Sequence, residues 1–504
     1  VLYQPHSVVY HEHRGTIGKR FTDAQIQSVL KKNFLLFCWK NIHEWSRLWP
    51  HFLYGFAGAV VSLFFGDSPE RATTGGFWRA LRQLPEAIAA RGRAKALAAL
   101  DDTETFLRPM GGYFRDRFAA MEPSPSPLRV LFVSPYPIVP PIHGGGVFMY
   151  QTIRQLARLC ELHLLVLLDY PHERHAHREL AQLCASVELI ARTESPRKQI
   201  ASMAPHAIAE FHNADIEWLL HRQIYTRRID VVQLEYTSMA QYAGDYKRIA
   251  CILFEHDIYF QSIGRGLPYI HSAFARFKAR FEYLRALRYE LRILPRLDRI
   301  QVCSRENGAY LESFLPQLAG RIDDGLRAGI ETSAYDFRPD RREPATMLFL
   351  GSFRHVPNQE ALHWFLRGVL PRVRERRPEA RLVVIGSDPP AAHTLPDCEG
   401  VELVGFVEDV REPLGRYALF VCPILSGSGV RVKLLEAFAA GIPVVSTRVG
   451  AEGLADEDGR ICALADEPGE FAERILELFD FPNKAKALAE RARAEVVANR
   501  DLAT

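Results

Sequence analysis

The chain has 504 residues, of which 48% are hydrophobic, so it can build about three domains of ~150 residues and is not disordered throughout. Its 63 lysines and arginines nearly balance 60 aspartates and glutamates, and the net charge of +3 provides no global field for nucleic acid or an acidic membrane. The eight cysteines have no close pairs, which excludes a zinc motif or a disulfide framework and indicates a reducing cytoplasm.

Residues 1–122 are predicted to form a mostly helical region, which ends at the run 123–127, Pro-Ser-Pro-Ser-Pro, an extended spacer that forbids a helix. No signal peptide opens the chain, which begins at Val1 inside strand-like sequence, so we expect a piece of a longer protein. Residues 51–66 are apolar and uncharged but shorter than the ~20 residues that a bilayer core requires, so we expect no crossing. Two interpretations remain for them, an amphipathic anchor in the membrane interface and a buried helix.

Beyond the spacer, apolar strands alternate with amphipathic helices, the pattern of parallel sheets covered on both faces. One series occupies residues 128–320, with strands expected at 128–134, 162–168, 230–236, 251–257 and 299–304. A second series occupies residues 340–490, with strands expected at 347–352, 381–387, 401–407, 418–424 and 443–447. Residues 321–339 have linker chemistry, and 491–504 form a terminal helix or tail. The predicted fold is α/β, with two doubly wound Rossmann-like domains that face each other across a ligand-binding cleft.

The first series carries two candidate motifs. Gly144, Gly145 and Gly146 open a helix, where free backbone amides and the helix dipole favour a phosphate or sugar; the alternative is a loop that needs glycine only for its turn. A dinucleotide fingerprint fails here, because Met149 stands at the third glycine position and a Pro-rich loop of roughly nine residues replaces the tight turn.

The second motif of this series is Glu255-His256-Asp257 at the carboxyl end of a strand. His256 can bond a sugar hydroxyl or act as an acid or base, and the alternative is a structural histidine satisfied by neighbouring acids. Glu235 and Tyr236, which end the preceding strand, form a weaker candidate.

The most informative stretch is residues 423–445. A strand leads into the loop Gly427-Ser428-Gly429, and a helix follows that carries Arg431, Lys433 and Glu436 before it stops at Gly441. Loop amides, the helix dipole and the two cations together form a site for a diphosphate. Lys433 and Glu436 lie three residues apart on one face, so the carboxylate can accept bonds from ribose hydroxyls without a metal; the alternative is an ordinary surface ion pair.

This stretch, together with Ser134-Pro-Tyr-Pro, the Gly144 loop, Glu255-His256-Asp257 and Gly405-Phe406-Val407, resembles the family four glycosyltransferases of GT-B fold (glycosyl transferases group 1) over residues 128–495. The resemblance implies an acceptor domain at 128–320 and a nucleotide-sugar donor domain at 340–490. It places Gly405, Phe406 and Val407 beside the nucleotide base and Glu436 at the ribose.

The chain also departs from that family pattern. Ser428 stands where relatives carry the first of two glutamates spaced eight residues apart, and Ser352 and Pro357 replace an Arg and a Lys. Arg354 lies near those positions but out of register, so the resemblance implies that Arg431 and Lys433 carry the phosphate charge.

The opening residues resemble a different family. Residues 7–16 and 31–42 are similar to the carboxyl-terminal end of a family two, GT-A glycosyltransferase, which implies that the longer protein is bifunctional.

The predicted function is metal-independent, retaining transfer of a sugar from a nucleotide-diphosphate sugar to a glycan or lipid-linked acceptor, in surface polysaccharide or glycoconjugate synthesis. Its predicted catalytic residues are His256, Arg431, Lys433 and Glu436, with no cofactor besides the donor substrate. We expect a cytoplasmic protein with peripheral contact to the inner membrane surface and no nucleic-acid partner. Two alternatives remain open: a catalytically inactive nucleotide-sugar-binding relative, and a nucleotide-sugar 2-epimerase on the same fold.

Overall fold

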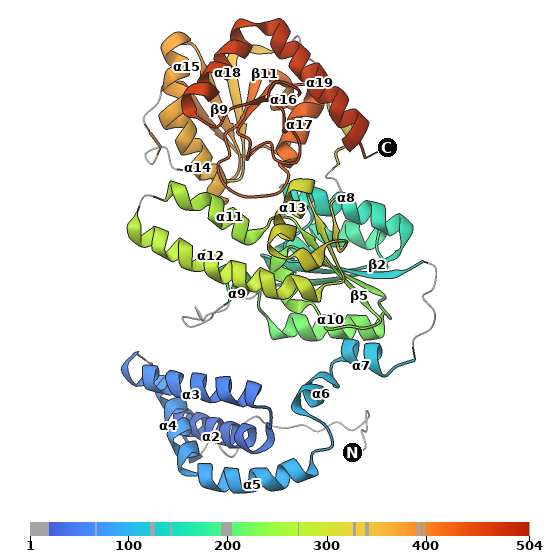
Figure 1. Cartoon of the computed structure of the whole chain (residues 1–504), viewed down its shortest axis with the longest axis vertical. Helices are drawn as coiled ribbons and strands as arrows, with labels where there is room; N and C mark the ends of the chain where they lie inside the picture. The colour runs from blue at the N-terminus through green and yellow to red at the C-terminus, as the bar shows by residue number, and fades with distance from the viewer. Residues whose placement is uncertain are drawn as a thin grey trace. The chain divides into compact units, whose positions relative to one another are not determined.

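The computed structural model describes residues 20–65, 68–120, 127–141, 144–192, 204–270, 272–325, 329–337, 342–390, 395–396 and 399–502. The chain divides into two compact units, Val1–Met110 and Gly111–Thr504. Figure 1 shows the first unit as a group of helices and the second as two α/β domains. Residues 7–16, which carry part of the resemblance to a family two enzyme, lie outside the described residues, and that resemblance stays a prediction.

The first unit is helical and has a small core. Its helices are α2 (Asp23–Asn41), α3 (Trp45–Phe65), α4 (Ser68–Arg82), α5 (Leu84–Leu97) and α6 (Asp102–Leu107). A capping box between Thr22 and Gln25 starts α2. Helix α3, which contains most of the apolar stretch 51–66, buries Ala59 but exposes Tyr54 and Phe64, so it is not the wholly buried helix of one interpretation, and the interface anchor stays a prediction. In the part of the chain that the structure describes, no helix is long and apolar enough to cross a membrane.

The second unit contains a seven-stranded sheet of parallel strands in the order β3-β2-β1-β4-β5-β6-β7. Its strands are β1 (Arg129–Ser134), β2 (Glu161–Leu168), β3 (Ser186–Ala191), β4 (Val231–Glu235), β5 (Ala250–Glu255), β6 (Arg299–Val302) and β7 (Ile322–Asp323). Its α-helices are α7 (Gly111–Arg117), α8 (Gly144–Leu159), α9 (His206–Glu210), α10 (Ala214–Thr226), α11 (Tyr259–Gly266), α12 (Ala273–Ile293) and α13 (Arg305–Phe314). Helix α7 precedes the proline run but belongs to this unit, because Gly112 packs closely against His221 and Ile224 of α10.

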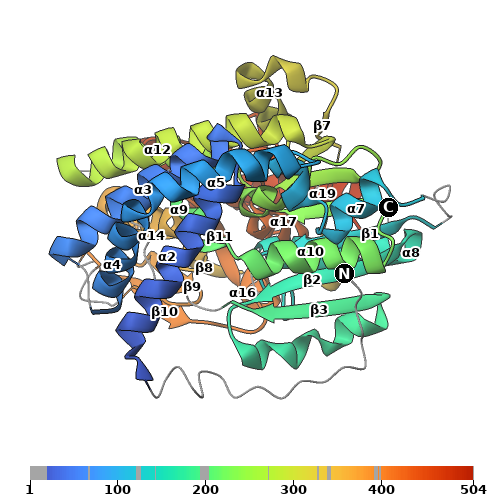
Figure 2. The same ribbon diagram turned by 90° about the horizontal axis from the view of Figure 1, so that it is seen from below.

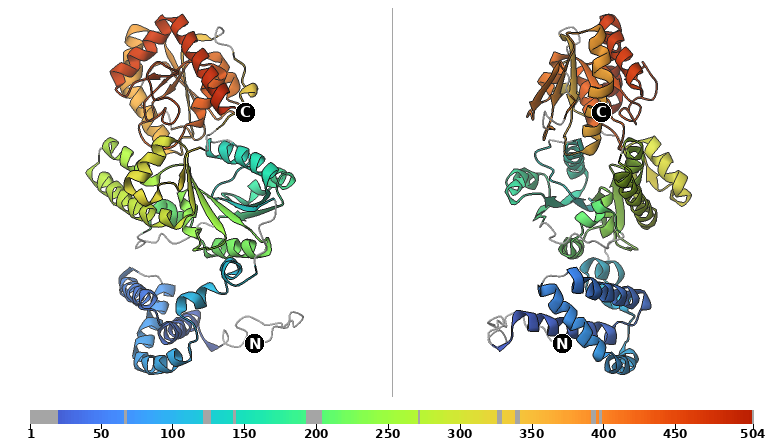
Figure 3. Two further views of the ribbon diagram at one scale, coloured as in Figure 1. Left: turned by 45° about the vertical axis from the view of Figure 1, so that its right-hand side comes forward. Right: turned by 90° about the vertical axis from the view of Figure 1, so that its left-hand side faces the viewer.

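The second sheet has six parallel strands in the order β10-β9-β8-β11-β12-β13. Its strands are β8 (Glu343–Leu350), β9 (Arg381–Ile385), β10 (Val401–Gly405), β11 (Tyr417–Cys422), β12 (Val444–Ser446) and β13 (Ala463–Leu464). Its α-helices are α14 (Val356–Trp364), α15 (Leu370–Arg376), α16 (Arg411–Arg416), α17 (Val432–Ala440), α18 (Pro468–Asp480) and α19 (Pro482–Arg500). Figure 3 shows helices on both sides of this sheet.

The burial of the strands agrees with two parallel sheets that helices cover on both faces. The last seven residues of β2 and the last five of β8 are all buried, as expected for strands covered on both faces. The strand order reverses between β1 and β4 in the first sheet and between β8 and β11 in the second, and ligands bind beyond the carboxyl ends of strands at such reversals. The predicted fold class, two Rossmann-like domains after a helical region, is confirmed, and Figure 2 shows the same layers from below.

Two buried carboxyl groups lie in the first sheet domain. Glu255 ends β5 and accepts a hydrogen bond from the Thr237 hydroxyl at 2.6 Å, and Glu290 of α12 accepts one from the Phe260 amide at 3.0 Å. Each has a second carboxyl oxygen that is buried and bonds to none of the described residues. Burial raises the pKa of both groups, and in Glu290 the nearby Glu255 adds to the rise.

We predict that these acids make the protein less stable as the pH rises. The folded-state pKa of Glu255 lies above its ordinary value of 4.5, so its contribution to stability is complete below pH 4.5 and is lost as the pH approaches the raised pKa. Glu255→Gln should reduce the slope of unfolding free energy against pH by up to about 1.4 kcal/mol per unit, measured by denaturant titration between pH 5 and pH 8. Glu217→Gln, on the exposed face of α10, is the control and should keep the slope. An unchanged slope in Glu255→Gln would contradict the assignment.

Candidate active site

The two predicted glycine loops meet at the carboxyl edges of the two sheets. Residues 423–431, which we call the donor loop, connect β11 to α17. A Cβ atom added to Gly144, the first residue of α8, would lie 3.4 Å from Cβ of Val432, the first residue of α17. The start of α8 in the first domain therefore lies directly against the start of α17 in the second.

The donor loop requires glycine at two positions. Gly427 has φ +95° and Gly429 has φ +76°, a region that side chains rarely adopt. A Cβ atom at Gly429 would lie 2.3 Å from the carbonyl oxygen of His256, so no side chain fits there. Helix α17 then ends at Gly441, with φ +67°, which is the left-handed stop that the sequence predicted.

Arg431 folds back over the donor loop. Its Nη1 donates to the carbonyl oxygens of Gly429, at 2.8 Å, and of Ser428, and Nη2 lies 3.4 Å from the carbonyl oxygen of Ser426. These acceptors are neutral, so the guanidinium holds the loop in shape and keeps its positive charge at the amino-terminal end of α17.

Lys433 joins α17 to the end of β8. Its Nζ donates to the carbonyl oxygen of Leu350 at 2.8 Å and to Oδ1 of Asn358 at 3.0 Å, and it lies 5.2 Å from the ring centroid of Phe349. Burial lowers the pKa of the Lys433 ammonium, because a charged group loses hydration there. All of these partners are neutral as well.

Glu436 is half-buried, and its partner is Tyr335. The tyrosine hydroxyl donates to Oε1 at 3.0 Å. Burial raises the pKa of Glu436 to about 7. Lys433 and Glu436 thus bond to separate partners, and within the described residues they do not form the surface ion pair of the alternative interpretation.

The imidazole ring of His256 contacts two consecutive residues at the end of the neighbouring strand β4. Its Nε2 lies 2.6 Å from Oε2 of buried Glu235, and its ring stacks on Tyr236 at a centroid distance of 3.9 Å. The acid that satisfies this histidine is therefore Glu235 from the weaker sequence candidate, and neither Glu255 nor Asp257 takes that place. A role for His256 in contact with substrate stays a prediction.

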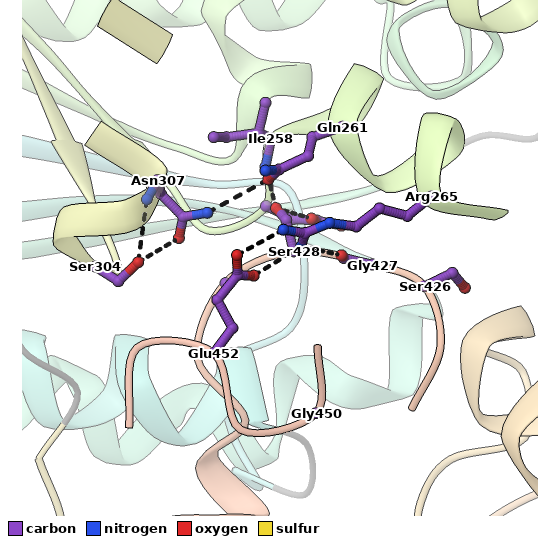
Figure 4. A network of polar contacts seen from close by, with 12 residues as sticks. Ile258, Gln261, Arg265, Ser304, Asn307, Ser426, Gly427, Ser428, Gly450 and Glu452 are labelled. Atoms are coloured by element: carbon purple, nitrogen blue, oxygen red, sulfur yellow. Dashed lines mark hydrogen bonds and ion pairs between the residues drawn. The ribbon is translucent and has the colours of Figure 1, made fainter. Parts of the chain in front are cut away.

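A set of polar contacts joins the two sheet domains at the donor loop (Figure 4). We call it the polar seam, and its residues are Asp257, Ile258, Arg265, Gly427, Ser428 and Glu452. The Ser428 hydroxyl donates to Oδ1 of Asp257 and accepts from the Ile258 amide at 2.7 Å. Arg265 of α11 donates to the carbonyl oxygen of Gly427 at 2.9 Å and to the two carboxylate oxygens of Glu452 at 2.7 and 2.6 Å. Ser428, for which the family resemblance implied a glutamate in relatives, therefore bonds across the two domains.

The remaining predicted residues lie apart from this seam. Arg354 is exposed and pairs with Asp388 at 2.9 Å. Gly405 has φ +86° at the end of edge strand β10, Phe406 is 54% exposed, and Val407 packs against the core of the second domain. Among the described residues, no hydrogen bond or ring contact links these four to the donor loop, and their role at a substrate stays a prediction.

Four residues of the site escaped the sequence analysis: Tyr335, Asn358, Arg265 and Glu452. Tyr335 lies in a segment with linker composition. Asn358 lies 75 positions from Lys433, Arg265 lies 162 positions from Gly427, and Glu452 bonds to Arg265, 187 positions away. In the described part of the chain, no group of three or more His, Cys, Asp or Glu side chains is arranged to hold a metal ion.

Two doubly wound parallel sheets joined at the donor loop define the GT-B class of fold. Residues 344–480 match the family described as Glycosyl transferases group 1. The second sheet domain therefore matches the glycosyl transferases group 1 family over most of its length. The family resemblance that the sequence motifs indicated is confirmed for this part of the chain.

The chain is similar to several known proteins. It is 27% identical over 139 residues to an uncharacterized 44.6 kDa protein in the cps region of Klebsiella pneumoniae, which is 26% of this chain and 36% of that protein. It is 34% identical over 100 residues to a phosphatidyl-myo-inositol mannosyltransferase of Propionibacterium freudenreichii, which is 19% of this chain and 25% of that protein. The matches thus span about a third and a quarter of these relatives.

Among solved structures, the sucrose-phosphate synthase of Thermosynechococcus elongatus superimposes with a TM-score of 0.58 at 16% identity. The superposition covers 74% of this chain and 95% of that one, and it supports the assignment of the fold.

We predict that Gly429→Ala is markedly more destabilising than Gly459→Ala. Both glycines have nearly the same φ, +76° and +75°, but a Cβ at Gly459 meets nothing within 4 Å, whereas one at Gly429 strikes the His256 carbonyl. Backbone strain of about 1–2 kcal/mol is common to both, so the difference between them measures the contact. Thermal unfolding should show a further loss of about 1–3 kcal/mol for Gly429→Ala. Equal losses would mean that the donor loop does not approach the first domain this closely.

Proposed function

We propose that the GT-B unit transfers a sugar from a nucleotide-diphosphate donor to a glycan or lipid-linked acceptor. One observation carries this proposal: Arg431 and Lys433 lie at the start of α17 and bond only to neutral oxygens, with no ion pair among the described residues. Two cations that form no ion pair beside a glycine loop are suited to bind an anionic ligand, and the charge of Asp257 acts on Arg431 without forming such a pair. A diphosphate supplies that anion, and the match of residues 344–480 to glycosyl transferases group 1 supports the choice.

In this proposal the chemistry is driven by the departing diphosphate. As the bond between sugar and phosphate breaks, negative charge grows on the phosphate oxygens and the sugar becomes oxocarbenium-like. The loop amides, Arg431 and Lys433 are already fixed by their hydrogen bonds, so they stabilise that charge without reorganising. The two cations supply the charge stabilisation, so we propose transfer without a metal or other cofactor, and with retention as the family resemblance implies.

Glu436 is proposed to bind the ribose of the donor. Its ionised carboxylate accepts hydrogen bonds from ribose hydroxyls on the face of α17 that follows Lys433. Tyr335 already donates one bond to Oε1, which orients the carboxyl group. Gly405, Phe406 and Val407 are proposed to border the base, and the loop at Gly144, Gly145 and Gly146 to approach the acceptor side with His256.

The proposed setting is the cytoplasm, and the proposed process is surface polysaccharide or glycoconjugate synthesis. The seven described cysteines are all free, which agrees with a reducing compartment. The cps-region relative and the mannosyltransferase relative support this direction by their names.

A second candidate function is nucleotide-sugar binding without turnover. It is favoured by Ser428, whose hydroxyl is occupied by Asp257 and Ile258 at the position where relatives carry a glutamate. The two candidates differ in one measurement. A transferase releases nucleoside diphosphate when donor and acceptor glycans are both present, whereas a binding protein holds the donor and releases none.

The double variant Arg431→Ala/Lys433→Ala should weaken binding of nucleoside diphosphates at least about tenfold. A hydrogen bond to a charged group contributes about 1.5–3 kcal/mol, and each cation is expected to make one to phosphate. Calorimetric titration with UDP, GDP and dTDP measures the change, with circular dichroism to verify folding. Arg376→Ala, which removes an exposed cation paired with Glu473, is the control and should bind normally. Full affinity in the double variant would place the phosphate elsewhere.

Donor affinity should rise as the pH increases through about 7, where Glu436 ionises. Because burial raises the pKa of this carboxyl, the acid is protonated below pH 7 and then accepts fewer ribose hydrogen bonds. Glu436→Gln should remove this pH dependence and lower the affinity at pH 8 by about 1.5–3 kcal/mol. A pH dependence that survives in Glu436→Gln would show that another group titrates.

A further inference from the structure

Helix α12 of the first sheet domain presents an apolar stripe to solvent. Phe274, Phe277, Phe281 and Leu284 are 68%, 67%, 47% and 59% exposed. Their spacings of three, four and three residues place all four on one side of the helix. Figure 2 shows α12 as a long helix along the margin of its domain. Four neighbouring large apolar side chains are unusual on a surface that only water covers.

The same helix is strongly basic. It contains six cations and two acids: Arg276, Lys278, Arg280, Arg285, Arg288 and Arg292, with Glu282 and Glu290. Lys278 Nζ lies 4.6 Å from the ring centroid of Phe274, and the Arg285 guanidinium carbon lies 5.2 Å from that of Phe281. The cations are thus interleaved with the apolar stripe.

The two acids of α12 neutralise little of this charge, because among the described residues Glu282 pairs with only one of the six cations, Arg285, and Glu290 faces the core. Glu290 is fully buried and accepts from the Phe260 amide at 3.0 Å. Glu282 is occupied by Arg285, by the Tyr259 hydroxyl at 3.2 Å and by the His206 amide at 2.6 Å. Lys278, Arg280 and Arg288 are exposed and form no ion pair with a described residue. The chain as a whole carries only +3, so this helix concentrates positive charge at one place.

The opposite side of α12 is fixed to the protein. Ala286 and Ile293 belong to the core of the first domain, and Tyr283 packs near Gly264 of α11. Helix α11 in turn carries Arg265, which bonds to the donor loop. The exposed stripe is therefore held on a rigid frame one helix away from the seam.

We propose that α12 binds the surface of an anionic lipid bilayer. A helix with Phe and Leu on one face and Lys and Arg around them lies in the plane of the interface, with rings at the acyl boundary and cations at lipid phosphates. The long stems of Lys278, Arg280 and Arg288 let their charged ends reach the headgroups while the rings insert. This proposal rests on the proposed function. A first domain that is bound to a bilayer would lie beside lipid-linked acceptors, which are held in the same bilayer.

The full chain and its variants would be tested by co-sedimentation with vesicles of phosphatidylcholine, alone or mixed with phosphatidylglycerol. We expect binding to the mixed vesicles and little to the neutral ones. Phe274→Ser/Phe277→Ser/Phe281→Ser should reduce the partition coefficient at least about tenfold. Lys278→Gln/Arg280→Gln/Arg288→Gln should reduce it about fivefold per cation removed, and added salt should do the same to the parent chain.

A matched control uses α10 of the same domain, which also exposes an aromatic ring. Trp218→Ser should leave vesicle binding nearly unchanged, although Trp218 is 51% exposed. Loss of binding in this control with full binding in the α12 variants would overturn the proposal, as would equal binding to both kinds of vesicle. A third outcome would also overturn the proposal: the parent chain binds no vesicles but self-associates, and the phenylalanine variant does not self-associate. The apolar stripe would then be an interface between two copies of the chain. None of these readouts uses donor or acceptor, so the proposed function can fail or hold independently.

Discussion

A Cβ atom at Gly429 would lie only 2.3 Å from the carbonyl oxygen of His256, and the architecture of the site depends on this approach of two backbones. Because the donor loop comes so near to the first domain, the Ser428 hydroxyl reaches the Asp257 carboxylate and the Ile258 amide. The same approach brings the Gly427 carbonyl within reach of Arg265, whose other bonds hold Glu452. The start of α17 is thereby fixed relative to His256 and to the start of α8.

The electrostatics of the site follow from how its charges are partnered. Arg431 and Lys433 are satisfied as hydrogen-bond donors by carbonyl and amide oxygens, and neither forms an ion pair with a described carboxylate, although the charge of Asp257 acts on Arg431. Glu436, one turn further along α17, has its pKa raised to about 7 by burial. The site thus combines fixed positive charge with an acid that is readily protonated, and this arrangement supports the proposed binding of a diphosphate and its ribose.

The fold could be predicted from the sequence to a large extent, because buried parallel strands are continuous apolar runs. All ten strands expected on that basis overlap strands of the structure, from β1 at residues 129–134 to β12 at 444–446. The three missed strands have physical reasons: β3 (Ser186–Ala191) is only half-buried at a sheet edge, and β7 and β13 have two residues each. The left-handed stop at Gly441 was predictable because glycine and a following proline are local signals.

The contacts of the site were much less predictable. The sequence marked Arg431, Lys433, Glu436 and His256 by residue type and spacing, but their partners come from distant segments. Tyr335 lies 101 positions from Glu436, and Arg265 lies 187 positions from Glu452. The sequence showed that Ser428 departs from the family pattern. It could not show that the Ser428 hydroxyl bonds to the Ile258 amide, because that residue lies 170 positions away in the chain.

The central claim is that the donor loop and the start of α17 hold a nucleoside diphosphate. Hydrogen–deuterium exchange of the backbone amides, with and without saturating UDP, GDP or dTDP, tests it most directly. The account predicts slower exchange in residues 426–436 with at least one of the nucleotides, accompanied by slower exchange at residues 256–265 across the seam. Protection confined to other segments, or none at all in a folded sample, would contradict it.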